Sequence, residues 1–203
     1  MKARRVGGLD PLGGTAENLE RICRVRLEEL FAFSPRALDP AETEVQHDMR
    51  IAAKRLRYLL ELSAFCFGPY VRRAATVAKE LQDVLGEIHD CDVMLPRVLR
   101  HAEELRTRDV AAVLERAGAA EDLAPRLAAR APSRAAYRGL AVLGVHLQGR
   151  RALLHRRFVA RWEELQRKGF RARLEWALGE RPVGGADGDG GGFVAPELGT
   201  ARA

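Results

Sequence analysis

The sequence predicts an all-α protein built from antiparallel helical bundles. Its 203 residues are rich in Ala, Leu, Arg and Glu, and only 6% of them are aromatic, a composition that favours helix over strand. Apolar residues recur at the three- and four-residue spacing of amphipathic helices, and no alternating strand pattern competes with that spacing. We expect about six to seven helices, including one long helix near the C-terminus.

Proline, glycine and capping residues divide the chain into these helices. Thr15 is expected to cap the first helix, which Ser34 and Pro35 end. Gly68 and Pro69 end the second helix. The third helix is expected to run from about residue 70 to 88 and to continue, or bend, through residues 90–108, with Pro96 as its kink or boundary. The predicted helices span residues 15–33, 41–67, 70–88 with its continuation through 90–108, 109–122, 134–168 and 170–178.

The chain divides into a flexible segment at 1–14, one helical domain at 15–178 and a Gly-rich disordered tail at 179–203. Cys23, Cys66 and Cys91 form no C-x-x-C pair, so neither a zinc site nor a disulfide framework is indicated. No apolar run resembles a signal peptide or reaches the length of a membrane span. We therefore expect a cytoplasmic protein that does not enter membranes.

The second helix carries a narrow cationic strip opposite its apolar stripe. At about 100° per residue, four cation-capable side chains fall within roughly 80° of one another. The opposite side carries an ordinary core stripe, made of Val45, Met49, Ala52, Leu56, Leu59, Leu60 and Ser63. Like charges on one strip repel each other unless anions lie between them. A solvated face is the alternative, but such faces usually carry interspersed acids, and this strip has only Glu61 near one end and Glu44 at its other margin. The four are His47, Arg50, Lys54 and Arg57.

The third helix presents a second polar strip that includes Lys79, Gln82, Gly86 and His89. Glycine within a helix costs about 1 kcal/mol relative to Ala, so Gly86 should permit the close approach of a neighbouring helix or of a ligand. Acidic residues on this helix are expected to pair with Arg side chains of a neighbouring helix and hold them extended. These acids are Asp83, Asp90 and Asp92.

The long helix and its continuation form the most basic part of the chain. Eleven basic residues lie between Arg134 and Arg173, against two glutamates, in a chain with a net charge of +6. Such a concentration repels itself and needs a counter-charge, which indicates an anionic partner. Four of the basic and imidazole side chains share one sector: His146, Arg150, Arg157 and Arg161.

Metal binding and catalysis are both weakly supported. His47, His89, His146 and Asp90 could supply metal ligands, but their spacing forms no recognised site, and the basic surroundings repel divalent cations. The sequence contains no G-x-S-x-G, P-loop or paired-carboxylate motif. We expect neither a metal nor a cofactor, and no catalytic residues.

Two segments together resemble the CHAD family (conserved-histidine α-helical domain). They read VQHDMRIAAKRLRYLLEL from Val45 and LQDVLGEIHDCDVML over 81–95, and the resemblance covers about residues 15–110. It implies antiparallel four-helix bundles, usually two related by a pseudo-twofold axis, and a basic groove that binds inorganic polyphosphate. Proteins of this kind are linked to polyphosphate granules and often also carry a CYTH-type phosphatase domain.

Carried over residue by residue, the family's histidine-and-basic motif falls on His47, Arg50, Lys54, Arg55 and Arg57. The second motif falls on Gly86, His89 and Asp90. Many relatives have Arg where His89 stands, which implies a weaker or more pH-sensitive contact. Residues 155–157 only loosely repeat the first motif, which longer relatives carry twice. Either the second half has degenerated, or two chains pair as a homodimer to rebuild the groove.

The sequence therefore predicts a non-enzymatic polyanion-binding protein whose ligand is inorganic polyphosphate. A nucleic-acid-binding module is the first alternative, because RNA and DNA offer the same phosphates, although few aromatic residues are available to stack on bases. A phosphohydrolase acting on phosphate chains is the second. The residues predicted to bind polyphosphate are His47, Arg50, Lys54, Arg55, Arg57, Lys79, His89, Arg150, Arg157 and Arg161.

Overall fold

The computed structural model describes residues 2–181, and all regular structure in that range is helical. The all-α prediction is confirmed, with one long helix in the C-terminal region. Most of the tail expected at 179–203 lies outside the described residues. The helices are α1 (Thr15–Ala32), η1 (Arg36–Leu38), α2 (Thr43–Ser63), η2 (Ala64–Cys66), α3 (Tyr70–Ala117), α4 (Pro125–Ala128), α5 (Arg134–Arg167) and α6 (Phe170–Gly179).

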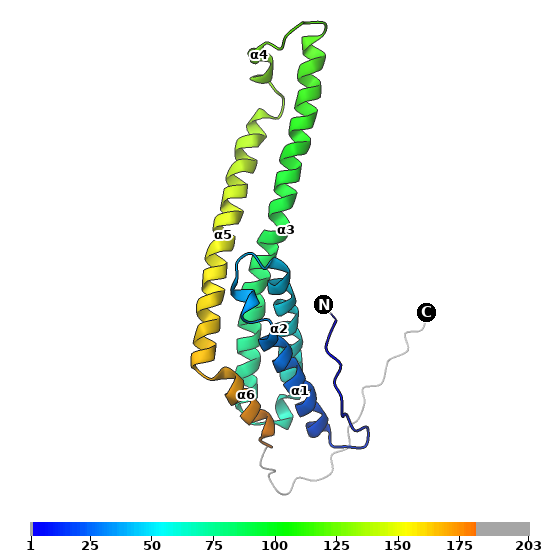
Figure 1. Ribbon diagram of the computed structural model, residues 1–203, viewed down its shortest axis with the longest axis vertical. Coiled ribbons are helices and arrows are strands. Elements are labelled where there is room, and N and C mark those ends of the chain that lie inside the picture. The colour runs from blue at the N-terminus through cyan, green and yellow to red at the C-terminus, as the bar shows by residue number, and fades with distance from the viewer. Residues whose placement is uncertain (1, 182–203) are drawn as a thin grey trace, which may run out of the picture.

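The molecule consists of a helical bundle from which a two-helix hairpin extends (Figure 1). The bundle contains α1, α2, the first part of α3, the last part of α5, and α6, which packs on α1, α3 and α5. Beyond it, α3 and α5 run on side by side, with α4 at the tip. We call residues 96–146 the distal hairpin.

The core of the bundle draws apolar side chains from five helices. The apolar stripe predicted on α2 is confirmed, because Met49, Ala52, Leu56, Leu60 and Ser63 are all fully buried. Burial of such side chains is the main favourable contribution to folding. The largest fully buried side chains come from every helix of the bundle: Leu27, Leu30, Met49, Leu56, Leu60, Leu81, Leu85, Ile88, Phe158, Trp162, Phe170 and Leu174.

The start of α1 differs from the prediction. Gly14, not Thr15, is the N-cap residue, and no side chain caps the helix. Asn18 instead holds the preceding chain in place, because its amide donates to the Asp10 carbonyl oxygen at 2.7 Å. Its Oδ1 accepts a hydrogen bond from the Asp10 backbone N–H at 3.0 Å. The polar side chain that organises this end therefore lies within the first turn of the helix.

The third helix is longer than predicted. It continues without interruption from Tyr70 to Ala117, through Pro96, so the separate helix expected at 109–122 is wrong. A proline removes only one backbone donor, and no further proline or glycine occurs between residues 97 and 117. Helix therefore persists to Gly118, which forms the C-cap.

The turn between α5 and α6 directs α6 back onto the bundle. Gly169 has a φ of 66°, a left-handed conformation that glycine adopts without a steric penalty. As a result Phe170, Leu174 and Leu178 enter the core. Within residues 2–181, none of the helices combines the length and apolar character that crossing a bilayer requires.

Candidate functional site

The basic residues predicted on α2 lie beside the polar strip predicted on α3. We call this surface the cationic strip, and we define it as His47, Arg50, Lys54 and Arg57 of α2 with Gln82, Gly86 and His89 of α3. Three contacts join the two helices along it, between Arg57 and Gln82, Arg50 and Gly86, and His47 and His89. Two segments that are distant in sequence thus form one surface.

Gly86 has the close neighbour that its position in a helix predicted. A Cβ built there would lie 3.4 Å from Nε of Arg50. The Arg50 side chain therefore lies across the backbone of α3 at the point where no side chain projects. This contact sets the position of the Arg50 guanidinium relative to α3.

His47 and His89 face each other at one end of the strip. Their ring centroids are 4.3 Å apart, with the planes tilted by 39°. The pKa of His47 is lowered, first by burial and then by the nearby charges of His89 and Arg50. His47 is consequently favoured in its neutral form when no anion is present.

Several polar atoms of the strip lack partners. Nδ1 of His47 and Nε of Arg50 are buried and make no hydrogen bond within residues 2–181. Leaving a buried polar atom without a partner costs about 1–3 kcal/mol. Unpartnered buried atoms do not stabilise the fold, so their presence points to another role. A hydrogen-bond acceptor on a bound ligand would satisfy a donor such as the Arg50 Nε–H.

The other two cations of the strip, Arg57 and Lys54, differ in the partners that their side chains have within the protein. Nε of Arg57 donates to Glu61 at 2.7 Å, and its Nη1 donates to Gln82 at 3.4 Å. Nζ of Lys54 lies 5.8 Å from the centre of the Tyr58 ring, and it has no carboxylate partner among the described residues. Lys54 and Arg50 are therefore the strip's most available cations.

Two residues predicted to bind polyphosphate, Lys79 and Arg55, are not part of the cationic strip. Lys79 pairs with Asp83 of its own helix at 2.7 Å. Arg55 lies about 160° around α2 from Arg57 and is therefore outside the strip, although the family motif includes it. A pocket of about 420 Å³ near His47 and His89 is bordered by the acidic residues Glu44 and Asp48. These acids make that end of the strip less favourable for an anion.

The basic residues predicted on α5 lie along a different edge of α3. Nη2 of Arg150 donates to Glu87 at 2.5 Å. Arg161 contacts Glu80 and donates to Glu164 at 2.8 Å. Part of the counter-charge that the basic long helix needs is therefore supplied by α3 itself.

Arg157 and His146 are exposed on α5. Arg157 lines a pocket of about 410 Å³ together with Arg161 and Glu80. His155, in the loose repeat of the first motif, is buried against Phe158, and burial is the main cause of its lowered pKa. The second half of the described chain thus has no counterpart of the arrangement around His47.

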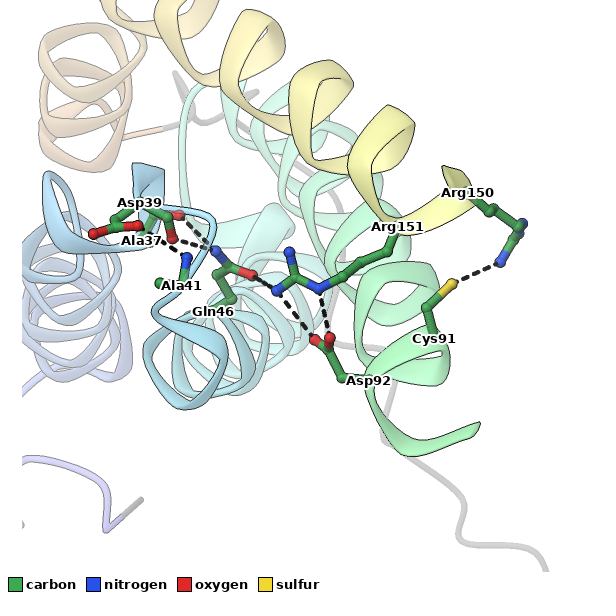
Figure 2. A network of polar contacts seen from close by, with 8 residues as sticks. All are labelled: Ala37, Asp39, Ala41, Gln46, Cys91, Asp92, Arg150 and Arg151. Carbon is green, nitrogen blue, oxygen red and sulfur yellow. Dashed lines mark hydrogen bonds and ion pairs between the residues drawn. The ribbon is translucent and has the colours of Figure 1, made fainter. Parts of the chain in front are cut away.

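Arg151, which the sequence reasoning did not single out, connects three parts of the bundle (Figure 2). Its Nε donates to Asp92 of α3 at 2.5 Å, and its Nη2 donates to Gln46 of α2 at 3.0 Å. The Gln46 amide in turn donates to the Asp39 carbonyl oxygen at 2.7 Å. Of the three aspartates expected to hold arginines of a neighbouring helix, Asp92 does so, Asp83 pairs within its helix, and Asp90 is exposed.

Within residues 2–181, no group of three or more His, Cys, Asp or Glu side chains could hold a metal ion. The strip instead offers guanidinium, ammonium and imidazole donors, which suit an anion with several oxygen atoms. Comparisons with curated proteins and with solved structures gave no match. The CHAD domain model matches residues 7–99, which include α1, α2 and the part of α3 that carries the strip. This match over residues 7–99 supports a CHAD-domain protein.

Proposed function

We propose that the protein binds inorganic polyphosphate along the cationic strip. CHAD domains bind polyphosphate in general, and the observation that favours this site is the state of Arg50. Its guanidinium lies over Gly86, and its buried Nε has no hydrogen-bond partner among the described residues. A phosphate oxygen would satisfy that donor.

The strip suits a repeating anion because its cations also repeat. Arg50, Lys54 and Arg57 are separated by four and three residues, so they follow one another along one face of α2. Each can contribute charge-assisted hydrogen bonds to phosphate oxygens. We propose that a phosphate chain runs from Arg50 towards Arg57, away from Glu44 and Asp48.

We propose binding without catalysis. Incubation with polyphosphate should release no phosphate, with or without a divalent metal, whereas release would favour the phosphohydrolase alternative. In competition, polyphosphate should displace RNA when the two are compared at equal phosphate concentration. The reverse order would favour the nucleic-acid alternative.

We also propose that the protein meets its ligand in the cytoplasm, at polyphosphate granules. Cys23, Cys66 and Cys91 are buried free thiols, and burial raises the pKa of Cys23 to about 11. Free thiols suit a reducing compartment. Imaging of the tagged protein beside stained granules is the direct test, and a diffuse distribution in granule-containing cells would contradict the second part of the proposal.

Calorimetric titration with long-chain polyphosphate tests the site. We compare the intact protein with the double variant Arg50→Glu/Lys54→Glu, because neither residue has a carboxylate partner in the described structure. The matched control is Arg108→Glu/Arg138→Glu, which makes the same charge change at exposed residues of the distal hairpin. Affinity should fall about tenfold or more in the strip variant alone.

Salt dependence provides a second measurement on the intact protein. Binding should weaken about tenfold or more between 50 mM and 200 mM salt, because the phosphate chain releases counterions when cations replace them. An affinity that does not change with salt would contradict the electrostatic mechanism. An equal loss of affinity in both double variants would show that net charge, rather than the strip, determines binding.

We further propose a second copy of the chain as the partner of the distal hairpin. The hairpin exposes several large apolar side chains, and over most of its length α3 and α5 have no third helix beside them (Figure 1). Two such hairpins related by a twofold axis would form a four-helix bundle. These exposed residues are Leu99, Val110, Leu114, Val142 and Val145.

Sedimentation velocity tests this pairing. The intact protein should sediment as a dimer, and Leu114→Asp/Val145→Asp should sediment as a monomer. Leu62→Asp is the control, because Leu62 is an exposed apolar residue of α2, outside the hairpin. A monomeric intact protein at concentrations up to about 100 μM, equivalent to an association weaker than roughly 5–6 kcal/mol, would reject the proposal.

A further inference from the structure

A second basic site lies at the junction of three helices, away from α2. A pocket of about 480 Å³ is enclosed by the start of α3, the end of α5 and the start of α6. We call it the junction pocket. Five cationic side chains line it: Arg72, Arg73, Arg161, Lys168 and Arg173.

The charges of the junction pocket are not balanced. Arg161 contacts Glu80 and Glu164, and Nζ of Lys168 pairs with Glu164 at 2.5 Å. Hydrogen bonds from Lys168 and Arg161 lower the pKa of Glu164 to about 2. Two carboxylates thus accompany five cations, which leaves three positive charges without a counter-charge.

The three remaining guanidinium groups belong to Arg72, Arg73 and Arg173. None of them forms a hydrogen bond or an ion pair with another described residue. They come from two helices, α3 and α6, that converge at the pocket, so the arrangement depends on the tertiary fold. Three unpaired guanidiniums facing one space repel each other, and an anion between them would remove that cost.

The adjoining helix starts favour a bound anion. Val77, Leu165 and Phe170 are buried core residues along the pocket wall, whereas Arg72, Arg73 and Arg173 are exposed to solvent. Tyr70 and Phe170, the first residues of α3 and α6, also line the pocket, and neither helix has a side-chain cap. The positive ends of both helix dipoles therefore lie at the pocket.

We propose that the junction pocket binds a compact triphosphate group. Guanidinium donors match phosphate oxygens in geometry, and three unpaired cations correspond to a short chain of charged phosphates. The volume lies within the range of small-molecule sites, so the ligand is a short group and not the length of a polymer. Its source is a free condensed phosphate, including the end of a longer chain, or the triphosphate of a nucleotide.

The junction pocket is independent of the cationic strip. No residue of α2 lines it, and none of the strip's residues does. The two sites can therefore be disabled separately, and this inference does not rest on the proposed function.

Calorimetric titration with tripolyphosphate, in the absence of metal, tests the proposal. The pocket variant is Arg73→Glu/Arg173→Glu, with Arg73→Gln/Arg173→Gln as a milder form that retains the shape of the side chains. The strip variant Arg50→Glu/Lys54→Glu and the hairpin variant Arg108→Glu/Arg138→Glu serve as controls. Circular dichroism establishes that each variant keeps its helical content.

Tripolyphosphate affinity should fall about tenfold or more in both pocket variants and stay within about twofold of the intact protein in both controls. Failure of the intact protein to bind tripolyphosphate would overturn the proposal. An equal loss in the hairpin variant would assign the effect to net charge. A loss confined to the strip variant would leave the proposed function standing and place the anion there.

A parallel titration with ATP distinguishes the two sources. Binding of ATP that is lost in the pocket variants would show that a nucleotide's triphosphate is accepted. Binding of tripolyphosphate without ATP would restrict the site to free condensed phosphate. Both results support a triphosphate site, whereas ATP binding that survives in the pocket variants would place nucleotide elsewhere on the protein.

Discussion

Arg50 of α2 lies across Gly86 of α3, with its Nε 3.4 Å from the position of a Cβ at residue 86. That distance is an ordinary van der Waals contact, so a single methyl group can be accommodated. Gly86→Ala should raise the free energy of unfolding by about 0.5–1 kcal/mol, because Ala is the better helix former. Chemical denaturation measures this change, and a loss of stability would indicate that Arg50 cannot adjust.

A larger side chain at the same position should separate stability from binding. Gly86→Leu would occupy the space under the Arg50 guanidinium and displace it from α3. We expect polyphosphate affinity to fall about tenfold while the helical signal is retained. Gly149→Leu is the matched control, because residue 149 is a helical glycine with no atom within 4 Å of its Cβ position.

His47 should take up a proton when polyphosphate binds near pH 6. Burial, followed by the charges of His89 and Arg50, lowers its pKa in the free protein. A polyanion favours the imidazolium form and so raises that pKa again. Calorimetry in two buffers of different ionisation enthalpy measures the uptake, which His47→Gln should reduce and His101→Gln should not.

The same residue makes the free protein less stable in mild acid. Because the folded pKa of His47 lies below its ordinary value of 6.5, the unfolded chain binds the proton first. Stability should therefore fall as the pH drops below about 6.5 and should cease to fall once the folded state is also protonated. Denaturation of His47→Gln should show a shallower decline between pH 7 and pH 5.5. The lowered pKa of His155 adds to the decline in the same direction.

Arg151→Ala should destabilise the bundle by roughly 2–3 kcal/mol. The side chains of Arg151 and Asp92 are only 16% and 19% exposed, so the variant leaves a poorly solvated carboxylate without its partner. It also removes the donor to Gln46. Arg156→Ala is the control at an exposed neighbour, with an expected change within about 0.5 kcal/mol. Equal effects of the two variants would contradict the connecting role of Arg151.

Asp109→Asn should loosen the distal hairpin locally. Asp109 accepts hydrogen bonds from the Tyr137 hydroxyl at 2.5 Å and from the Ser133 backbone N–H at 3.0 Å. Burial acts to raise the pKa of Asp109, but these hydrogen bonds lower it overall. Amide exchange should become about tenfold faster in the hairpin and remain unchanged in the bundle. Glu115→Gln, an exposed change on the same helix, should leave exchange unaffected.

Features that depend on local spacing were predictable from the sequence. The three- and four-residue period placed Met49, Leu56 and Leu60 in the core, and helix propensity alone indicated that Gly86 has a close neighbour. The position of Pro96 was misleading, because a single missing donor does not end a helix that is supported by packing along α5.

Pairings between distant segments were not predictable. Arg150 and Glu87 are separated by 63 residues, and Arg161 and Glu80 by 81. Helical periodicity shows which face a residue occupies, but not which helix packs against that face. The junction pocket was not predictable for the same reason, since Arg73 and Arg173 line one pocket only because the turn at Gly169 returns α6 to the bundle.

Because α3 is one uninterrupted helix, it sets fixed distances between the sites along it. At 1.5 Å per residue, its 48 residues form a rod about 72 Å long. The rod begins at the junction pocket, passes the cationic strip at Gly86, and ends roughly 45 Å further on at the tip of the hairpin. A partner molecule bound at the tip would therefore lie at a fixed distance and in a fixed direction from a bound phosphate chain. Inserting or deleting residues in α3 and α5 together would change that distance by about 1.5 Å per residue and that direction by about 100° per residue.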